Sequence, residues 1–337
     1  MPLDAMRPRE TARGFLDGHG WAGIAPAPLA GDASFRKYFR LVDGARRAVL
    51  MDAPPPQEDV RPFVKLAAHL RALGLSAPRI DAADEGAGFL LLEDLGDDTF
   101  ARALAAGADE AVLYAAATDV LVALHAHPAQ TRVDCPAYDA AVLDREAALL
   151  LDWFLPEWGA RPDAAVRAAY FEAWAHVYPR AAVGGPALVL RDFHIDNLMR
   201  LPRTGIAACG LLDFQDALIG SPAYDLASLI GDARRDVPPG IARACVERYL
   251  AARPDLPPAA FEAALAVLSA QRNAKIAGIF VRLFRRDGKP HYLKHIDRVW
   301  RLLACDLAHP ALAPVRAWFD AHVPPAWRRT PPIEVPA

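Results

Sequence analysis

The spacing of apolar residues changes at residues 93–98, where the chain reads EDLGDD. Before this segment, two strand-like runs flank Asp43-Gly44 within SFRKYFRLVDGARRAVLMD, and an Asp-Gly pair between such runs is typical of a tight hairpin turn. After it, alanine-rich stretches follow helical spacing at about 109–126, 139–153 and 163–178. This order predicts an α+β fold with two lobes, a small antiparallel β-rich lobe followed by a larger and mainly helical one.

Shorter patterns complete both lobes. In the first, apolar residues between Val60 and Leu73 recur with helical spacing, and GFLLLED at 88–94 is predicted to be a strand. In the second, two short apolar runs interrupt the helices, ALVL at 187–190 and CGLLDF at 209–214. Each run ends in polar residues that include an aspartate. Because residues at the ends of buried strands are held rigidly yet reach a cleft, we expect the chemistry at these two places.

Composition and charge exclude several kinds of function. The 337 residues are enough for one large core or two smaller ones, and the formal net charge is only −3. The longest cationic stretch, Arg282 to Lys289, is a local cluster, so nucleic acid is not expected as a partner. We expect a cytoplasmic protein, because the four cysteines are far apart and the N-terminus has no apolar stretch. We expect it not to enter a membrane, because no run of 18 apolar residues occurs. We also expect a monomer.

The segment LVLRDFHIDNLM, residues 188–199, places five polar side chains in seven consecutive positions directly after an apolar run. Asp192 is followed five residues later by the amide Asn197, and Asp213 lies in the next apolar run. Oxygen ligands of this kind suit magnesium, which takes one or two carboxylates and fills its other positions with water and phosphate oxygens. A remaining aspartate could accept the proton of an attacking hydroxyl. Taken singly, each residue could equally cap a turn, but their joint spacing favours a site.

Three motifs in this region carry a resemblance to a known family. They are RDFHIDN, then DFQDA beginning at Asp213, then GSPAYDLASL. Together they resemble the catalytic segment of the aminoglycoside phosphotransferase and choline kinase superfamily, which are small-molecule relatives of protein kinases. The resemblance implies a bilobal kinase-like fold that uses ATP and Mg²⁺. It implies that Asp192 is the catalytic base and that Asn197 and Asp213 hold the magnesium.

The same resemblance assigns the nucleotide site and the boundaries of the lobes. The backbone of Glu93 to Leu95 would form the hinge that reads adenine, and Ser34, Phe35 and Arg36 in GDASFRKYFR would lie over the ATP phosphates. We place the N-terminal ATP-binding lobe at 1–92 and the hinge at 93–98. The helical C-terminal lobe with the catalytic loop and the substrate site is placed at 99–323, and a flexible tail at 324–337.

Within the superfamily, the chain is most similar to the anomeric amino-sugar kinases, which phosphorylate N-acetylmuramate and N-acetylglucosamine at the C1 hydroxyl in peptidoglycan recycling. The segments VLMDAPP, LLEDLGD and GIFVRLFRRDGKPHYL contribute to this similarity. A small amino sugar is therefore the expected partner. Helical spacing also aligns Gln271, Lys275, Gly278 and Arg282 in one stripe, which would attract an anionic sugar or would simply be a solvated helix face. The candidate substrate residues are Asp216, Lys275 and Arg282.

Two positions depart from the protein kinase pattern. Leu190 stands where protein kinases have a histidine before the catalytic Arg-Asp pair. Met51 stands on the strand where a phosphate-binding lysine is expected, and a thioether cannot neutralise a phosphate. Another cation must serve, and Arg36, Lys37 and Arg40 on the preceding strand are the candidates. Strand alternation puts Arg36 and Arg40 on one face, and we rank Arg36 first.

Several alternatives stay open. The chain could be a kinase of another small alcohol, aminoglycoside-like or choline-like, or a nucleotide-binding pseudokinase, as the two departures suggest. It could also be a metal-dependent hydrolase in which Asp192, His194, Asp196 and Asp213 bind a metal that activates water. His194 fits a structural role in the loop better than a catalytic one. Asp225 is expected to pin the catalytic loop or to cap a helix.

Overall fold

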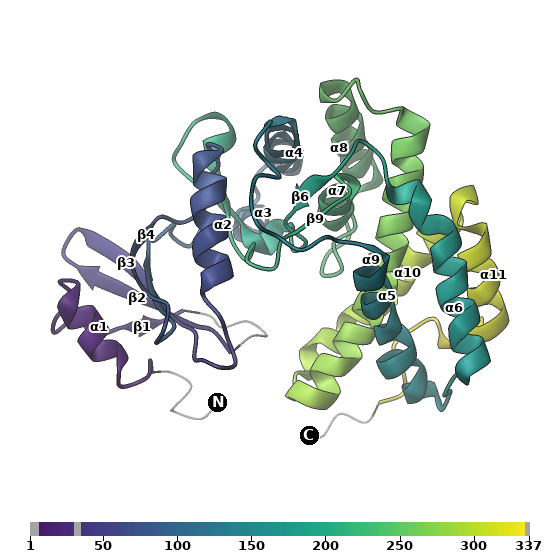
Figure 1. The fold of residues 1–337 in the computed structure, drawn as a ribbon, viewed down its shortest axis with the longest axis horizontal. Helices are drawn as coiled ribbons and strands as arrows, with labels where there is room; N and C mark the ends of the chain where they lie inside the picture. The colour runs from purple at the N-terminus through teal and green to yellow at the C-terminus, as the bar shows by residue number, and fades with distance from the viewer. Residues whose placement is uncertain (1–6, 30–34, 334–337) are drawn as a thin grey trace. The chain divides into compact units, whose positions relative to one another are not determined.

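The computed structural model describes residues 7–29 and 35–333, and it divides into two compact units (Figure 1). The first unit comprises Met1–Ala108 together with Ile195–Asp216, and the second comprises Asp109–His194 with Ala217–Ala337. The second unit is mainly helical, as the change of pattern after residue 98 predicts. The segment 195–216 packs with the first unit, whereas our sequence-based boundaries place it in the helical lobe.

The first unit is built on a five-stranded sheet in which every neighbouring pair of strands is antiparallel. The predicted hairpin is confirmed, because Asp43 pairs with Arg46 across a turn in which Gly44 has a φ of 59°. In sheet order the strands are β1 (Ala27–Pro28), β2 (Lys37–Asp43), β3 (Arg46–Asp52), β5 (Phe89–Leu92) and β4 (Ile80–Asp84).

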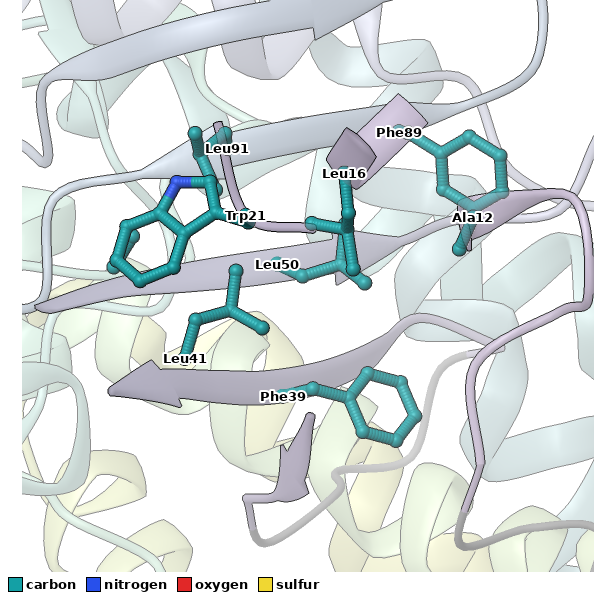
Figure 2. Close-up of a cluster of buried hydrophobic side chains, with 9 residues drawn as sticks. Ala12, Leu16, Trp21, Phe39, Leu41, Leu50, Phe89 and Leu91 are labelled. Atoms are coloured by element: carbon teal, nitrogen blue, oxygen red, sulfur yellow. The ribbon is translucent and has the colours of Figure 1, made fainter. Parts of the chain in front are cut away.

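One face of this sheet is covered by helix α1 (Ala12–Gly18) and by the segment that follows it (Figure 2). Side chains on a strand alternate between faces, so alternate residues in β5 and in the middle of β2 and β3 point into the same apolar cluster. Figure 2 shows the labelled members of this cluster, which are Ala12, Leu16, Trp21, Phe39, Leu41, Leu50, Phe89 and Leu91. By the same alternation Met51 belongs to the opposite face, where its side chain is fully buried.

A second hairpin completes the first unit. It is formed by β7 (Leu198–Arg200) and β8 (Cys209–Leu211), and it is attached to the remainder of the unit by backbone hydrogen bonds. The Leu211 N–H donates to the Ser76 carbonyl at 2.9 Å, and the Arg200 N–H donates to the Asp98 carbonyl at 2.7 Å. The helices of the unit besides α1 are α2 (Arg61–Ala72), predicted from its spacing, and α3 (Phe100–Ala105).

The three predicted alanine-rich helices are confirmed in the second unit. Each begins after an aspartate, at positions 109, 139 and 163, whose carboxylate accepts backbone N–H groups of the first turn. The middle one becomes a π turn at Leu150–Phe154. In chain order the helices are α4 (Glu110–Ala126), α5 (Ala140–Leu149), α6 (Ala164–Val177), α7 (Ala223–Ile230), α8 (Pro239–Ala252), α9 (Pro258–Asp287), α10 (Ile296–Leu307) and α11 (Ala313–His322).

Helix α9 is the long central element of this unit, and its predicted polar stripe is largely not solvated. Gln271 is fully buried and Lys275 is 9% exposed. Gly278 lies so close to the end of α5 that an added Cβ would stand 2.2 Å from the Leu149 carbonyl oxygen. The only two-stranded sheet among the described residues of this unit pairs β6 (Ala187–Val189) with β9 (Leu218–Gly220), which confirms the first of the two predicted short strands.

The C-terminal segment has defined contacts up to the end of the described residues. The Thr330 hydroxyl donates to Asp297 Oδ1 at 2.8 Å, and the Trp327 ring stacks on Trp158. Within residues 7–29 and 35–333, no helix combines the length and the apolar character needed to cross a bilayer.

Candidate active site

The β7–β8 hairpin brings together the two residues predicted to hold magnesium. Leu198 pairs with Leu211, and the next residue along, Leu212, donates its N–H to the Asn197 carbonyl at 2.9 Å. Asn197 therefore precedes β7, and Asp213 follows β8, at the same end of the hairpin. Asn197 and Asp213, which are sixteen residues apart in the sequence, are thus both carried by the β7–β8 hairpin.

The conformation of Asp213 is unusual. Its φ is 58°, and among the described residues only Arg191 shares a positive φ without being glycine. Such a backbone conformation costs of order 1–3 kcal/mol of free energy and persists only where the surrounding structure imposes it. The next residue is packed in place, because the Phe214 ring stacks on Phe63 of α2 with centroids 4.9 Å apart. The Asp213 side chain itself stays 28% exposed.

Asp213 already faces a positive charge. The Arg36 Nη2 atom lies 3.3 Å from Asp213 Oδ1, and Gln215 Nε2 donates to the same oxygen at 2.8 Å. A carboxylate that is partly exposed and holds a cation in this way fits a magnesium ligand, since Mg²⁺ needs only one or two protein oxygens. The assignment of Asn197 and Asp213 as magnesium ligands stays a prediction.

The structure separates the three candidate phosphate cations. Arg40 is bound to the hinge, because it contacts Asp94 Oδ2 at 2.8 Å, Asp97 Oδ2 at 2.7 Å and the Gly96 carbonyl at 3.1 Å. Lys37 belongs to the other face of β2 by alternation. Arg36 forms an ion pair with Asp213. The geometry thus favours Arg36, which the sequence ranks first, and its role toward phosphate stays a prediction.

Glu93, in the predicted hinge at residues 93–98, is held through both its backbone and its side chain. The Glu93 N–H donates to the Arg79 carbonyl at 2.8 Å, which continues the sheet. The Glu93 carboxylate binds Arg203 Nη2 at 2.6 Å, and Arg203 Nη1 also donates to Ser76 Oγ at 2.9 Å. Because the N–H of Glu93 is engaged, an adenine ring would have to use other backbone groups between Glu93 and Leu95. The assignment of this segment to adenine stays a prediction.

The loop predicted to cover the phosphates is described only from Phe35 onward, and Ser34 lies outside the described residues. The Phe35 N–H donates to Glu58 Oε1 at 3.0 Å, and the Phe35 side chain is 66% exposed. Glu58 also lies 3.7 Å from Arg36 Nε. Sequence reasoning missed Glu58, because its spacing from residues 35 and 36 carries no periodic signal.

In the second unit, Asp225 pins the segment that leads into Asp192. Its carboxylate is fully buried in α7 and accepts the N–H of Leu190 at 2.7 Å and that of Arg191 at 2.8 Å. Burial raises the pKa of Asp225 to about 7, and the two N–H groups act against that rise. The predicted pinning role of Asp225 agrees with these contacts. It holds Arg191 at a φ of 70°, immediately before the half-buried Asp192.

A buried ionic cluster anchors the Arg191 side chain. Glu146 of α5, 8% exposed, pairs with the Arg191 guanidinium and with Lys275 Nζ at 2.9 Å, and it accepts the Tyr138 hydroxyl at 2.5 Å. Burial alone would raise the pKa of Glu146, but the charges of Lys275 and Arg191 hold it below its ordinary value. Sequence reasoning missed Glu146, although two cations on buried positions require a carboxylate partner.

The candidate substrate residues lie in different units. Asp216 is exposed and belongs to the first unit, where Gln215 Nε2 donates to it at 3.1 Å. Lys275 belongs to the second unit and contacts the Tyr224 hydroxyl at 3.3 Å in addition to Glu146. Arg282 is half-buried, and burial together with Arg286 lowers its pKa. The role of all three in substrate binding stays a prediction.

His194 is a structural residue of the loop in this geometry. Its ring is 3% exposed, and Arg234 Nη1 lies 3.2 Å from Nε2. An arginine N–H can only donate, so Nε2 is an acceptor and the ring is neutral. Burial, with a contribution from Arg234, lowers the pKa of His194 to about 3.

This burial predicts a pH effect on stability. In the unfolded chain the ring ionises near pH 6.5, so below that pH the unfolded state takes up a proton that the folded state does not. Lowering the pH from 7.5 to 5.0 is therefore expected to cost about 2 kcal/mol through His194 alone. The measurement is urea unfolding at both pH values, and His194→Gln should lose about that much of the pH dependence. A variant with the same pH dependence as the parent would contradict it.

Comparison with known proteins places these features in context. A family model described as the phosphotransferase enzyme family matches residues 26–261. A curated N-acetylmuramate/N-acetylglucosamine kinase of Caulobacter vibrioides is 41% identical, with 95% of this chain and 98% of that protein aligned. The protein with the same name in Pseudomonas aeruginosa is 41% identical over 87% of this chain and 88% of its own length.

Solved structures agree on the fold. A choline/ethanolamine kinase family protein from Mesorhizobium loti superposes with a TM-score of 0.60 at 15% identity, over 91% of this chain and 99% of that one. The GDP complex of wild-type aminoglycoside 2'-phosphotransferase-IIIa superposes with a TM-score of 0.61 at 16% identity, over 88% and 97%. At these identities the likeness shows a shared kinase-like architecture.

Proposed function

Because the chain belongs to the phosphotransferase enzyme family, we propose that it is an ATP- and magnesium-dependent kinase that phosphorylates the anomeric C1 hydroxyl of N-acetylmuramate or N-acetylglucosamine. The observation that carries the proposal is the 41% identity with a curated kinase of these two sugars across almost the full length of both chains. The hairpin that joins Asn197 to Asp213, and the pinned loop before Asp192, supply the parts that such a reaction needs.

The proposed mechanism assigns one task to each part. Asp192 orients the sugar hydroxyl and accepts its proton as the γ-phosphoryl group is transferred. Asp225 and Glu146 keep the backbone and the side chain of Arg191 in place, so that Asp192 is presented in one conformation. Asn197 and Asp213 would hold magnesium, which supplies charge neutralisation at the phosphates when bound. Most of the rate enhancement would come from positioning.

The charge around the catalytic loop supports an acidic or neutral amino sugar over a cationic aminoglycoside. In the buried cluster two cations, Arg191 and Lys275, face one carboxylate, Glu146. Arg282, on the same helix as Lys275, adds a further positive charge. The carboxylate of N-acetylmuramate would be attracted by this excess of positive charge. We propose Lys275 and Arg282 as substrate residues on this ground, with Asp216 as a partner for sugar hydroxyls.

The test is a direct search for the product. The protein is incubated with ATP, Mg²⁺ and, one at a time, N-acetylmuramate, N-acetylglucosamine, glucose, choline and an aminoglycoside. Phosphorus NMR then locates any new phosphate, and we expect it on C1 of the two amino sugars. Phosphate on another hydroxyl would reject the anomeric assignment and keep the kinase. Nucleotide binding without ATP consumption by any acceptor would favour a pseudokinase, and ATP-independent hydrolysis of a phosphate ester would favour a metal-dependent hydrolase.

The wider setting follows from the substrate. A kinase that acts on free N-acetylmuramate handles a sugar released from the cell wall, so we propose a role in peptidoglycan recycling. A cytoplasmic, monomeric enzyme would suit that role, because ATP is supplied in the cytoplasm.

A further inference from the structure

The strand position that carries a phosphate-binding lysine in protein kinases is filled here by an apolar side chain. Met51 lies in β3 and is fully buried. In the sheet register Met51 is opposite Tyr38 of β2, and Arg36 precedes Tyr38 by two residues. Alternation therefore puts Arg36 on the same face as Met51, one strand away. A positive charge is present on the expected face, but it comes from the residue just before the neighbouring strand β2.

Arg36 is held between two carboxylates from different parts of the first unit. Its Nη2 lies 3.3 Å from Asp213 Oδ1, and its Nε lies 3.7 Å from Glu58 Oε2. The side chain is 12% exposed, so these contacts are partly shielded from water. Arg40, which shares this face within β2, is instead paired with Asp94 and Asp97 of the predicted hinge.

Glu58 makes the second half of the arrangement. It lies in the turn before α2 and binds both Arg36 and the backbone N–H of Phe35, at 3.0 Å for the latter. One carboxylate thus fixes the backbone and the side chain at the entrance of β2. In protein kinases a glutamate performs a similar task for the strand lysine from the helix that follows β3. In this protein Glu58 lies before helix α2, and Arg36 likewise lies before strand β2.

We propose that Arg36, positioned by Glu58, replaces the missing strand lysine, neutralising Asp213 in the nucleotide-free protein and turning to the ATP phosphates when magnesium occupies Asp213. The inference rests on the proposed function only in assuming that this family member uses Mg²⁺ and ATP. The physical reason is that a doubly charged Mg²⁺ at the Asp213 carboxylate would repel the guanidinium of Arg36 that pairs with the same group. The planar guanidinium then finds its next partner in the phosphate oxygens that accompany the metal.

The first test compares ligands that differ only in the number of phosphate groups. Isothermal titration calorimetry with ATP, ADP and adenosine, each with Mg²⁺, measures Kd for the parent, Arg36→Ala and Arg36→Lys. We expect Arg36→Ala to weaken ATP binding about 10-fold or more, ADP binding less, and adenosine binding not at all. Arg36→Lys should recover part of the loss. An unchanged ATP affinity, or an equal loss for adenosine, would overturn the proposal.

The second test examines the nucleotide-free state. Electron paramagnetic resonance follows Mn²⁺ binding to the apoprotein, and we expect Arg36→Ala to bind Mn²⁺ several-fold more tightly than the parent, because Asp213 has lost its cation. Asp213→Asn should abolish that gain. Weaker or unchanged Mn²⁺ binding in Arg36→Ala would overturn the neutralising role. A purely structural role for Arg36 would not tighten the binding of a metal.

Glu58 is tested as a positioning residue. Glu58→Gln should raise KM for ATP several-fold with a smaller change in kcat, and Glu58→Asp should be intermediate. The matched control is Arg61→Ala, which removes an exposed arginine paired with Asp59 in the same turn and should leave both constants unchanged. Equal losses in Glu58→Gln and Arg61→Ala would reject the positioning role. The calorimetric titrations and the Mn²⁺ titration are made without sugar, so failure of the sugar assignment would leave their outcome intact.

Discussion

Asp192→Asn is expected to lower kcat by about 10² to 10⁴-fold, while the affinity for ATP stays within about threefold of the parent. The amide has almost the same size as the carboxylate, so the loop held by Asp225 should keep its conformation. What the variant loses is the ability to accept the hydroxyl proton. A large fall in kcat without a change in nucleotide binding separates a base from a residue that merely supports the loop.

The measurement is steady-state turnover of N-acetylmuramate, combined with calorimetric titration of ATP. Asp196→Asn serves as the matched control, because Asp196 is an exposed carboxylate four residues further along the chain. It should keep close to full activity if the chain is a kinase, whereas a hydrolase with Asp196 as a metal ligand would lose activity. A fully active Asp192→Asn enzyme would reject the base assignment.

Gly278→Ala is expected to lower the free energy of unfolding by about 2 kcal/mol or more. An alanine in place of a helical glycine ordinarily stabilises a protein by up to about 1 kcal/mol, because it reduces the freedom of the unfolded chain. At this position the sign reverses. The new Cβ would stand 2.2 Å from the Leu149 carbonyl oxygen and 2.3 Å from its carbon, and both belong to backbone that cannot move without shifting α5.

Urea unfolding followed by circular dichroism measures this effect. The matched control is Gly240→Ala in α8, where an added Cβ meets nothing within 4 Å, and that variant should be as stable as the parent or slightly more stable. If Gly278→Ala also proves as stable as the parent, the close approach of α9 to the end of α5 is not as the structure has it.

Local patterns predicted most of the fold. The helices after residues 109, 139 and 163 follow from their apolar spacing, and the structure adds an aspartate cap at each start. The hairpin at Asp43-Gly44 follows in the same way from the turn residues between two strands. Such features depend on neighbours in the sequence, and the sequence displays them directly.

Features that depend on distant partners were not predictable in this way. The stripe on α9 reads equally as a solvated face or a ligand site. The structure buries Gln271, which contradicts the solvated face, and pairs Lys275 with Glu146, 129 residues away. The periodicity of a helix identifies a face but not what that face contacts. For the same reason Glu58 and Glu146 carry no signal of their own.

By itself, the sequence determined the two-lobe α+β class and, through the motifs around residues 191–225, the prediction of a site at Asp192, Asn197 and Asp213. Only the tertiary structure decided which arginine faces Asp213. Alternation puts Arg36 and Arg40 on the same face of β2, but Arg40 meets the hinge aspartates and Arg36 meets Asp213, 177 residues along the chain. Alternation is a local property of the backbone, whereas the carboxylate that each guanidinium reaches is set by how distant segments pack.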